Sequence, residues 1–310
     1  MKKIFASIAA VVLALSSVQA QDLAQITEIY NTGAASLTSG DKETALKAFE
    51  QAYSLATALG DEGKEVADNC KGVIPDLYLS IAKGLVNSAD YSGAIAKINQ
   101  AIEVATKFGN ADIVSEAKEL LPKVLMQNAG TLLNAKKYIE AAEIYQQVFD
   151  ADPTNGTAAL RLGLALNGAG QADKAKEILT KASELGQESA ASKQLYNIFL
   201  KEAASALKTK NFAQAAESAV SAIQYNESAQ AYQIAGQAYQ MLGKASEAIK
   251  YFDKYLELAP NAKNATQIAF TVGALYQQLK NNSKAVEYFE KAVSDPTYGA
   301  QAKKLIEALK

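Results

Sequence analysis

Histidine and tryptophan are absent from this sequence of 310 residues, and cysteine occurs once. Without histidine, the chain lacks the commonest general base and the commonest transition-metal ligand of proteins. The single cysteine, Cys70, excludes an intrachain disulfide, and we expect its thiol to be small buried filler. Proline is scarce, at 5 residues, and 49% of the chain is apolar. This composition is typical of closely packed helices rather than of a disordered chain.

An excess of charge of one sign is also lacking, because 31 basic and 33 acidic residues leave a formal net charge of −2. So small an imbalance does not indicate nucleic acid or an acidic surface as the partner. Long apolar runs are confined to the start of the chain. We therefore predict no membrane span in the mature protein.

The first twenty residues have the three parts of a secretory signal peptide. A basic start at Lys2-Lys3 precedes a largely apolar run over Ile4–Leu15 and a small-residue cleavage site at Val18–Ala20. The apolar run is shorter than the roughly 20 residues that a spanning helix needs. We predict an exported protein whose mature chain begins near Gln21, most simply a periplasmic protein of a Gram-negative bacterium and otherwise a secreted one.

One pattern recurs along the rest of the chain and is clearest between Ala229 and Pro260. Bulky, small and aromatic residues follow one another there at helical offsets, with a turn glycine between two helical stretches. The residues that carry the pattern are Tyr232, Gly236, Tyr239, Gly243, Ala248, Phe252 and Pro260. Their order predicts a helix, a turn and a second helix.

The pattern recurs around an alanine near the start of each second helix. These anchor alanines are Ala45, Ala94, Ala141, Ala175, Ala215, Ala248 and Ala285. Twelve positions before each anchor lies a small residue, which lets two helices approach closely. The small residues are Gly33, Ala82, Ala129, Gly163, Ala203, Gly236 and Gly273. Four positions after the anchor lies a bulky residue that fills the gap, except in the fifth copy, which has Ala219; the bulky residues are Phe49, Ile98, Tyr145, Leu179, Phe252 and Phe289.

This pattern resembles the tetratricopeptide repeat (TPR). The resemblance implies an all-α fold, a right-handed α-α superhelix of about seven helix-turn-helix repeats with a C-terminal capping helix. After the signal peptide at residues 1–20, we expect a single solenoid over residues 21–310. Its repeats are placed approximately at 26–60, 61–108, 111–154, 155–187, 188–227, 228–261 and 262–297, with the cap at 298–310. Repeats two and three are long variants, whose Pro75 and Pro122 we expect in the first turn of a helix.

No arrangement of residues in the sequence indicates catalysis. Gly236 and Gly243-Lys244 do not form a phosphate-binding loop, because six residues separate the glycines instead of four and no strand precedes them. We predict no catalytic residue, no metal ligand and no cofactor. Two alternatives to a binding scaffold stay open: an accessory subunit or hydrolase with an unrecognised active site, and a self-assembling structural solenoid, which would be a homo-oligomer.

The resemblance implies that the first helices of the repeats line a concave channel that holds a protein or peptide partner. In the earlier repeats the candidate residues are Lys83, Asn87, Lys123, Met126, Asn134, Arg161, Asn167, Lys201 and Lys208. In the last two repeats they are Gln230, Gln233, Gln237, Gln240, Gln267, Phe270, Gln277 and Gln278. Amides both donate and accept hydrogen bonds, which suits a peptide backbone. Arg161, the only arginine, has a planar fork that fits a carboxylate.

Overall fold

The computed structural model describes residues 18–309, and over this range the chain forms helices and turns without any strand. The chain divides into two compact units, with the boundary between Ala151 and Asp152. Unit 1 contains α1 (Val18–Thr38), α2 (Lys42–Ala58), the 3-10 turn η2 (Gly60–Gly63), α3 (Lys64–Asn87), α4 (Tyr91–Phe108), α5 (Ala111–Asn134) and α6 (Tyr138–Ala151). Unit 2 contains α7 (Gly156–Gly168), α8 (Ala172–Ala182), η3 (Ser183–Gln187), α9 (Glu188–Lys208), α10 (Phe212–Tyr225), α11 (Ala229–Met241), α12 (Ala245–Leu258), α13 (Ala265–Gln278), α14 (Asn282–Glu290) and α15 (Gly299–Leu309). The predicted all-α fold is confirmed. The predicted signal peptide falls largely on residues 1–17, which lie outside the described residues.

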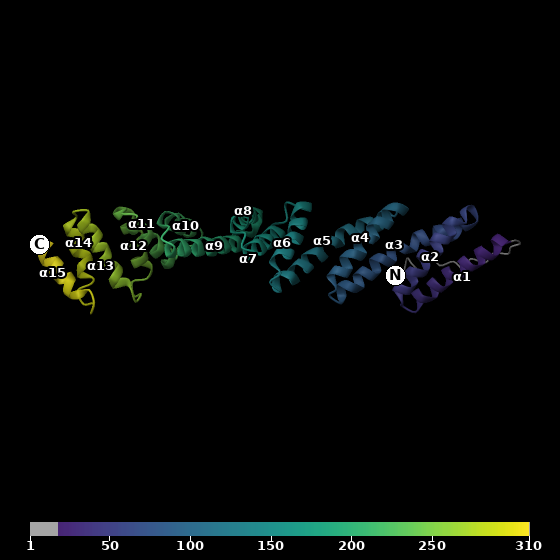
Figure 1. Cartoon of the computed structure of the whole chain (residues 1–310), viewed down its shortest axis with the longest axis horizontal. Helices are drawn as coiled ribbons and strands as arrows, with labels where there is room; N and C mark the ends of the chain where they lie inside the picture. The colour runs from purple at the N-terminus through teal and green to yellow at the C-terminus, as the bar shows by residue number, and fades with distance from the viewer. Residues whose placement is uncertain (1–17, 310) are drawn as a thin grey trace. The chain divides into compact units, whose positions relative to one another are not determined.

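Consecutive helices pack side by side within each unit and are joined by short turns (Figure 1). We call α1, α3, α5, α7, α9, α11 and α13 the first helices, and α2, α4, α6, α8, α10, α12 and α14 the second helices. Each first helix packs against the second helix that follows it. Between residues 18 and 309 the helices thus form seven helix-turn-helix pairs, as the recurring pattern predicts, and α15 follows the last of them.

The close packing within each pair comes from the small residues that the pattern singled out. All seven anchor alanines have 0% exposure. A Cβ atom added to Gly236 would lie 2.5 Å from Cδ1 of Phe252, and one added to Gly273 would lie 2.7 Å from Cδ1 of Phe289. The bulky residue of the second helix therefore lies directly on the small residue of the first. The predicted pairing of small and large residues is confirmed for the four pairs whose small residue is a glycine: Gly33, Gly163, Gly236 and Gly273.

The turn between the two helices of a pair has the same backbone conformation in every copy. Five positions before each anchor, one residue has a positive φ; these residues are Gly40, Ala89, Lys136, Gly170, Lys210, Gly243 and Lys280. The next residue caps the second helix in several pairs. For example, the Asp90 carboxylate accepts a hydrogen bond from the Gly93 N–H at 2.9 Å, and the Asn281 side chain accepts one from the Lys284 N–H at 3.1 Å. Such caps satisfy amide groups that the helix itself leaves free.

A reciprocal exchange at this turn should change stability in opposite directions. Gly243 has φ 71° and Lys280 has φ 59°, and a Cβ atom at Gly243 would meet nothing within 4 Å. Only backbone strain therefore separates glycine from other residues here. We expect Lys280→Gly to stabilise the protein and Gly243→Ala to destabilise it, each by about 1 kcal/mol. Urea titrations of both variants would test this, and shifts of the same sign would contradict it.

The two prolines of the long repeats lie elsewhere than predicted. Pro75 is in the interior of α3 and Pro122 is in the interior of α5, each a continuous helix of 24 residues. The residues that make these two repeats long therefore belong to the first helix itself, which runs through its proline. Because proline has no N–H, the Lys71 and Lys118 carbonyls lose their usual helical donors.

The last helix, α15, has the position predicted for a capping helix. Ala302 and Ile306 of α15 pack against Ala285, Phe289 and Ala292, which covers the last second helix. The predicted capping helix is therefore confirmed.

In unit 1, Cys70 has 0% exposure, and burial raises the pKa of its thiol to about 12. A protonated, buried thiol is unreactive, as expected of a small core residue.

Candidate partner-binding surface

Four exposed cations lie on two neighbouring first helices of unit 2. Arg161 is on α7, and Lys193, Lys201 and Lys208 are on α9. We call these four residues the cationic stripe. The three lysines fall within an arc of about 80° on α9, since an α-helix turns about 100° per residue. The buried side of α9, which includes Leu195 and Ile198, faces the opposite direction.

The cations of the stripe have no acidic partner within the described residues. Every ion pair of unit 2 takes its cation from a second helix or from the residue that ends one: Lys176, Lys181, Lys254, Lys284 or Lys291. Exposed lysines of the second helices are thus largely used within the protein. The stripe is left available to another molecule.

The one acidic residue in the middle of α9 is directed away from the stripe. Glu202 accepts a hydrogen bond from Lys176 of α8 at 2.9 Å, and Lys176 also lies 2.9 Å from Asp173. Burial of Lys176 opposes its charged form, but the hydrogen bonds to Asp173 and Glu202 outweigh this and raise the pKa of its ammonium group. Glu202 therefore neutralises a cation of α8 rather than one of the stripe.

The next first helices, α11 and α13, carry no charged residue at all. Their outward positions have glutamine instead, and we call this set the amide stripe: Gln230, Gln233, Gln237, Gln240, Gln267, Gln277 and Gln278. Each is exposed or half-buried. The first helices of unit 2 thus change from cationic to amide-bearing along the chain, as the sequence indicated.

The candidate residues of unit 1 lie in a surface of mixed charge. Lys83 of α3 pairs with Glu116 of α5 at 2.6 Å, so this predicted partner-binding lysine has an internal partner. Asp76, two turns earlier on α3, is half-buried, and burial raises the pKa of its carboxyl group. The remaining candidates here are exposed or half-buried: Asn87, Lys123, Met126 and Asn134. Unit 1 thus presents no uniform field to a partner.

Two positions differ from the sequence-based list. Phe270, predicted to face a channel, packs with its ring centroid 5.2 Å from the rings of both Phe289 and Tyr298. Lys193 was missed, although it lies eight residues before Lys201 on the same helix. Counting back two helical turns from Lys201 would have found it. Asn167, also predicted, is half-buried on α7.

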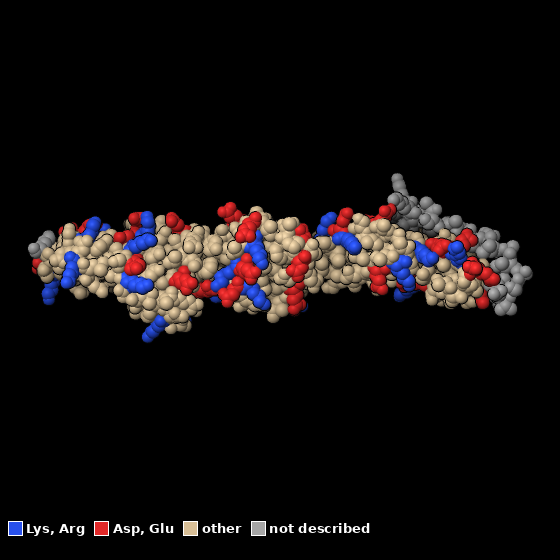
Figure 2. Space-filling view, turned by 90° about the horizontal axis from the view of Figure 1, so that it is seen from above, with Lys and Arg blue, Asp and Glu red and all other residues tan. Residues whose placement is uncertain are grey.

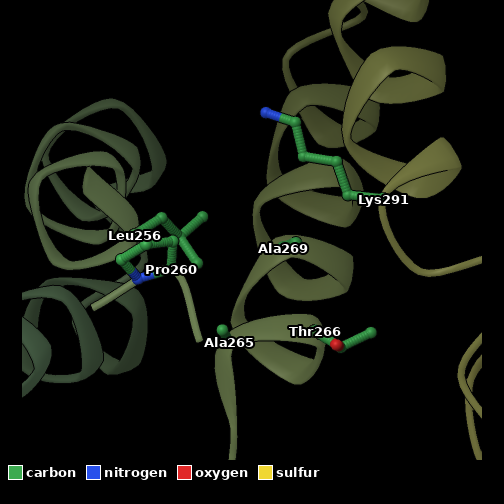
Figure 3. A pocket seen from close by; sticks show the side chains of 6 residues that line it. All are labelled: Leu256, Pro260, Ala265, Thr266, Ala269 and Lys291. Carbon is green, nitrogen blue, oxygen red and sulfur yellow. The ribbon is translucent and has the colours of Figure 1, made fainter. Parts of the chain in front are cut away.

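A separate pocket of about 340 Å³ lies among α12, α13 and the end of α14. It is lined by Leu256, Pro260, Ala265, Thr266, Ala269 and Lys291. Figure 3 shows Leu256 and Pro260 across from Ala265 and Ala269, with Lys291 beyond them. The Lys291 amine is already engaged, 3.9 Å from the Tyr288 ring centroid and 3.8 Å from Glu287. Apart from Lys291 and the hydroxyl of Thr266, the lining side chains are apolar.

Over the face shown in Figure 2, side chains of both charges are interspersed among uncharged residues. Within the described residues, no group of three or more His, Cys, Asp or Glu side chains is placed to hold a metal ion. None of the described helices combines the length and the apolar character needed to cross a bilayer. The exposed faces of the first helices in unit 2 are therefore the best-defined candidate site.

Three segments of the chain match models described as tetratricopeptide repeat: residues 132–197, 229–262 and 266–294. These matches support a TPR protein. The second covers the pair α11 and α12, and the third covers most of α13 and α14. No curated protein is similar enough to match the chain.

Several solved structures are similar to parts of the chain. A crystal structure of MamA protein is 23% identical, with a TM-score of 0.36, over 58% of this chain and 94% of its own. MamA 41-end from Desulfovibrio magneticus RS-1 is 17% identical, with a TM-score of 0.34, over 60% and 96%. YrrB, described as a TPR protein with an unusual peptide-binding site, is 22% identical, with a TM-score of 0.34, over 58% and 91%. These similarities concern the fold alone.

Proposed function

We propose that this protein is an exported, non-catalytic scaffold that binds a protein or extended peptide along the first helices of unit 2. One observation carries the proposal: within the described residues, the cations on this face are not paired with acidic groups of the protein itself. Arg161, Lys201 and Lys208 have no ion-pair partner among the described residues, whereas the second helices pair many of theirs. An exposed, polar, unpartnered face built on rigid helices suits a binding surface.

Export is the second part of the proposal, and it rests on the sequence of the first twenty residues. In the full chain, α1 begins at Val18. Cleavage after Ala20 would therefore leave the part of α1 from Gln21 onward, including the buried Leu23, Ile26 and Tyr30, in the mature chain. Removal of the signal peptide is thus compatible with an intact first repeat.

Site-specific photo-crosslinking in the native envelope tests the proposal. Asn197 lies between Lys193 and Lys201 on the exposed side of α9, and Lys174 is an exposed residue of α8. A photoreactive residue at position 197 should capture a protein partner, while the matched residue at position 174 should not. N-terminal sequencing of the same mature protein should begin at or near Gln21.

Each contrary result has a definite meaning. Equal capture from positions 174 and 197, or capture from 174 alone, would show that α9 is not the binding face. Capture of a second copy of this chain would favour self-assembly instead. A mature protein that retains Met1 would contradict export.

A further inference from the structure

We propose that the cationic stripe of unit 2 binds an extended acidic segment of the partner, with Asp or Glu side chains three to four residues apart. This inference rests on the proposed function and names the chemistry of the partner. Three observations support it: the charge balance of α7 and α9, the spacing of the lysines along α9, and the residues that lie between the cations.

The charge balance of the stripe differs from that of the whole chain. The protein has a formal net charge of −2, yet α7 carries Arg161 and no acid. On α9, Glu188 is the first residue of the helix, and Glu202 is bound to Lys176. The remaining cations thus form a local positive field on a slightly acidic protein. Such a field attracts anionic partners and sets their orientation.

The spacing of the lysines fits an extended chain. Lys193, Lys201 and Lys208 follow one another at intervals of about 10 to 12 Å, since an α-helix rises about 1.5 Å per residue. An extended peptide advances about 3.3 Å per residue, so three to four of its residues span each interval. Acidic side chains at that spacing would meet successive lysines while the peptide runs along α9.

Arg161 extends the stripe onto the neighbouring helix. It lies two residues before Gly163, and Lys201 lies two residues before Ala203, so the two cations have the same place in successive repeats. The helices that carry them, α7 and α9, are in contact, and packed helices lie about 8–10 Å apart. An acidic side chain directed across the peptide could therefore reach the Arg161 guanidinium, which binds a carboxylate with two hydrogen bonds.

The residues between the cations favour a peptide over a nucleic acid. On the exposed side of α9, Asn197 and Ala204 separate the three lysines. Proteins that bind single-stranded nucleic acids place aromatic side chains in such a groove for bases to stack on. The stripe has none, whereas Asn197 can both donate to and accept from a peptide backbone.

Fluorescence anisotropy with two labelled synthetic peptides tests the inference on the whole mature chain. One peptide has Glu at every fourth position in a Gly-Ser-Gln background, and the other has Gln at those positions. At low ionic strength the Glu peptide should bind about tenfold more tightly than the Gln peptide, because only its carboxylates meet the stripe. Raising the salt concentration should reduce this difference through screening.

Matched double variants locate the effect. Arg161→Gln with Lys201→Gln removes two cations of the stripe. Lys174→Gln with Lys303→Gln removes two exposed cations of α8 and α15 that have no ion-pair partner in the described part of the chain. We expect the stripe variant to bind the Glu peptide about tenfold more weakly, with about twofold to fivefold lost per charge. The control variant should stay within about twofold of the parent. Circular dichroism on both variants verifies that they fold.

Three results would overturn the inference: equal binding of the two peptides by the parent, equal losses in both double variants, or displacement of the Glu peptide by a single-stranded oligonucleotide more readily than by unlabelled Glu peptide. The crosslinking experiment distinguishes failure of this inference from failure of the proposed function. A partner that crosslinks at position 197 but has no acidic segment leaves the function standing and removes the inference. Absence of a crosslink at that position removes the function itself.

Discussion

Replacing Phe252 with alanine should lower the free energy of unfolding of unit 2 by about 3–5 kcal/mol, the cost typical of a buried phenylalanine. Phe252 has 0% exposure and lies in a cluster with Ala248, Ile249 and Tyr255. Its ring fills the gap that Gly236 leaves on the facing first helix. Alanine would leave a cavity there, since two helices joined by a short turn cannot close it by moving together.

A double-mutant cycle would show that the cost comes from this contact. Gly236→Ala alone should destabilise the protein by about 1–3 kcal/mol, because its new methyl group would lie 2.5 Å from Cδ1 of Phe252. In the Phe252→Ala background the same methyl group has room. The two effects should therefore be far from additive, as expected for residues in direct contact.

Gly84→Ala serves as the control for this cycle, because Gly84 lies in the interior of α3 and a Cβ atom there meets nothing within 4 Å. Alanine should stabilise that helix by about 0.5–1 kcal/mol. Denaturant titrations followed by circular dichroism measure all five proteins: the parent, the two single variants, the double variant and Gly84→Ala. If the effects of Gly236→Ala and Phe252→Ala simply add, the proposed packing of Phe252 on Gly236 is wrong.

The helix pairs could be predicted because their determinants are close together in the sequence. A small residue, an anchor alanine twelve positions later and a bulky residue four positions beyond it all belong to one pair. The turn between them repeats as well, with a positive φ five positions before each anchor. Even the fifth pair keeps this geometry. There Ala219 stands in place of the bulky residue, and Ala203 and Ala219 pack instead with Ile234 and Ala235 of the next first helix.

Features that depend on contacts between pairs were harder to predict. The sequence places Lys83 on an exposed face, but Lys83 forms an ion pair with Glu116, which lies 33 residues later on another first helix. Phe270 has the register of a channel residue, yet Tyr298, which precedes the cap, lies against its ring. The prolines misled for a local reason. Pro75 and Pro122 suggested helix starts, but each helix continues through its proline.

Part of the cationic stripe could be predicted from the sequence. Arg161, Lys201 and Lys208 follow from counting along the repeat, because exposure on a first helix depends mainly on its own register. That these cations lack ion-pair partners among residues 18–309 does not follow from counting. It depends on the ion pair between Glu202 of α9 and Lys176 of α8, which belong to two different helix pairs.

Replacing Ala248 with leucine should destabilise the protein by about 1–3 kcal/mol through overpacking. Ala248 has 0% exposure, as do the six equivalent alanines. The space around these anchors is small. A Cβ atom added to Gly273, for instance, would lie 3.2 Å from the carbonyl oxygen of the anchor Ala285. A leucine at the anchor must push the two helices apart or leave its preferred rotamer.

The damage should be local, because repeats in such arrays are stabilised mainly by their immediate neighbours. Hydrogen exchange read by mass spectrometry should show faster exchange in α11 and α12, a smaller change in α10 and α13, and little change in unit 1. Ala213→Leu is the matched control, since Ala213 is an exposed alanine near the start of another second helix, α10. It should alter stability by less than about 0.5 kcal/mol. A melting curve for Ala248→Leu that coincides with those of the parent and Ala213→Leu would show that the anchor position tolerates bulk, and that close approach of the two helices does not depend on a small side chain there.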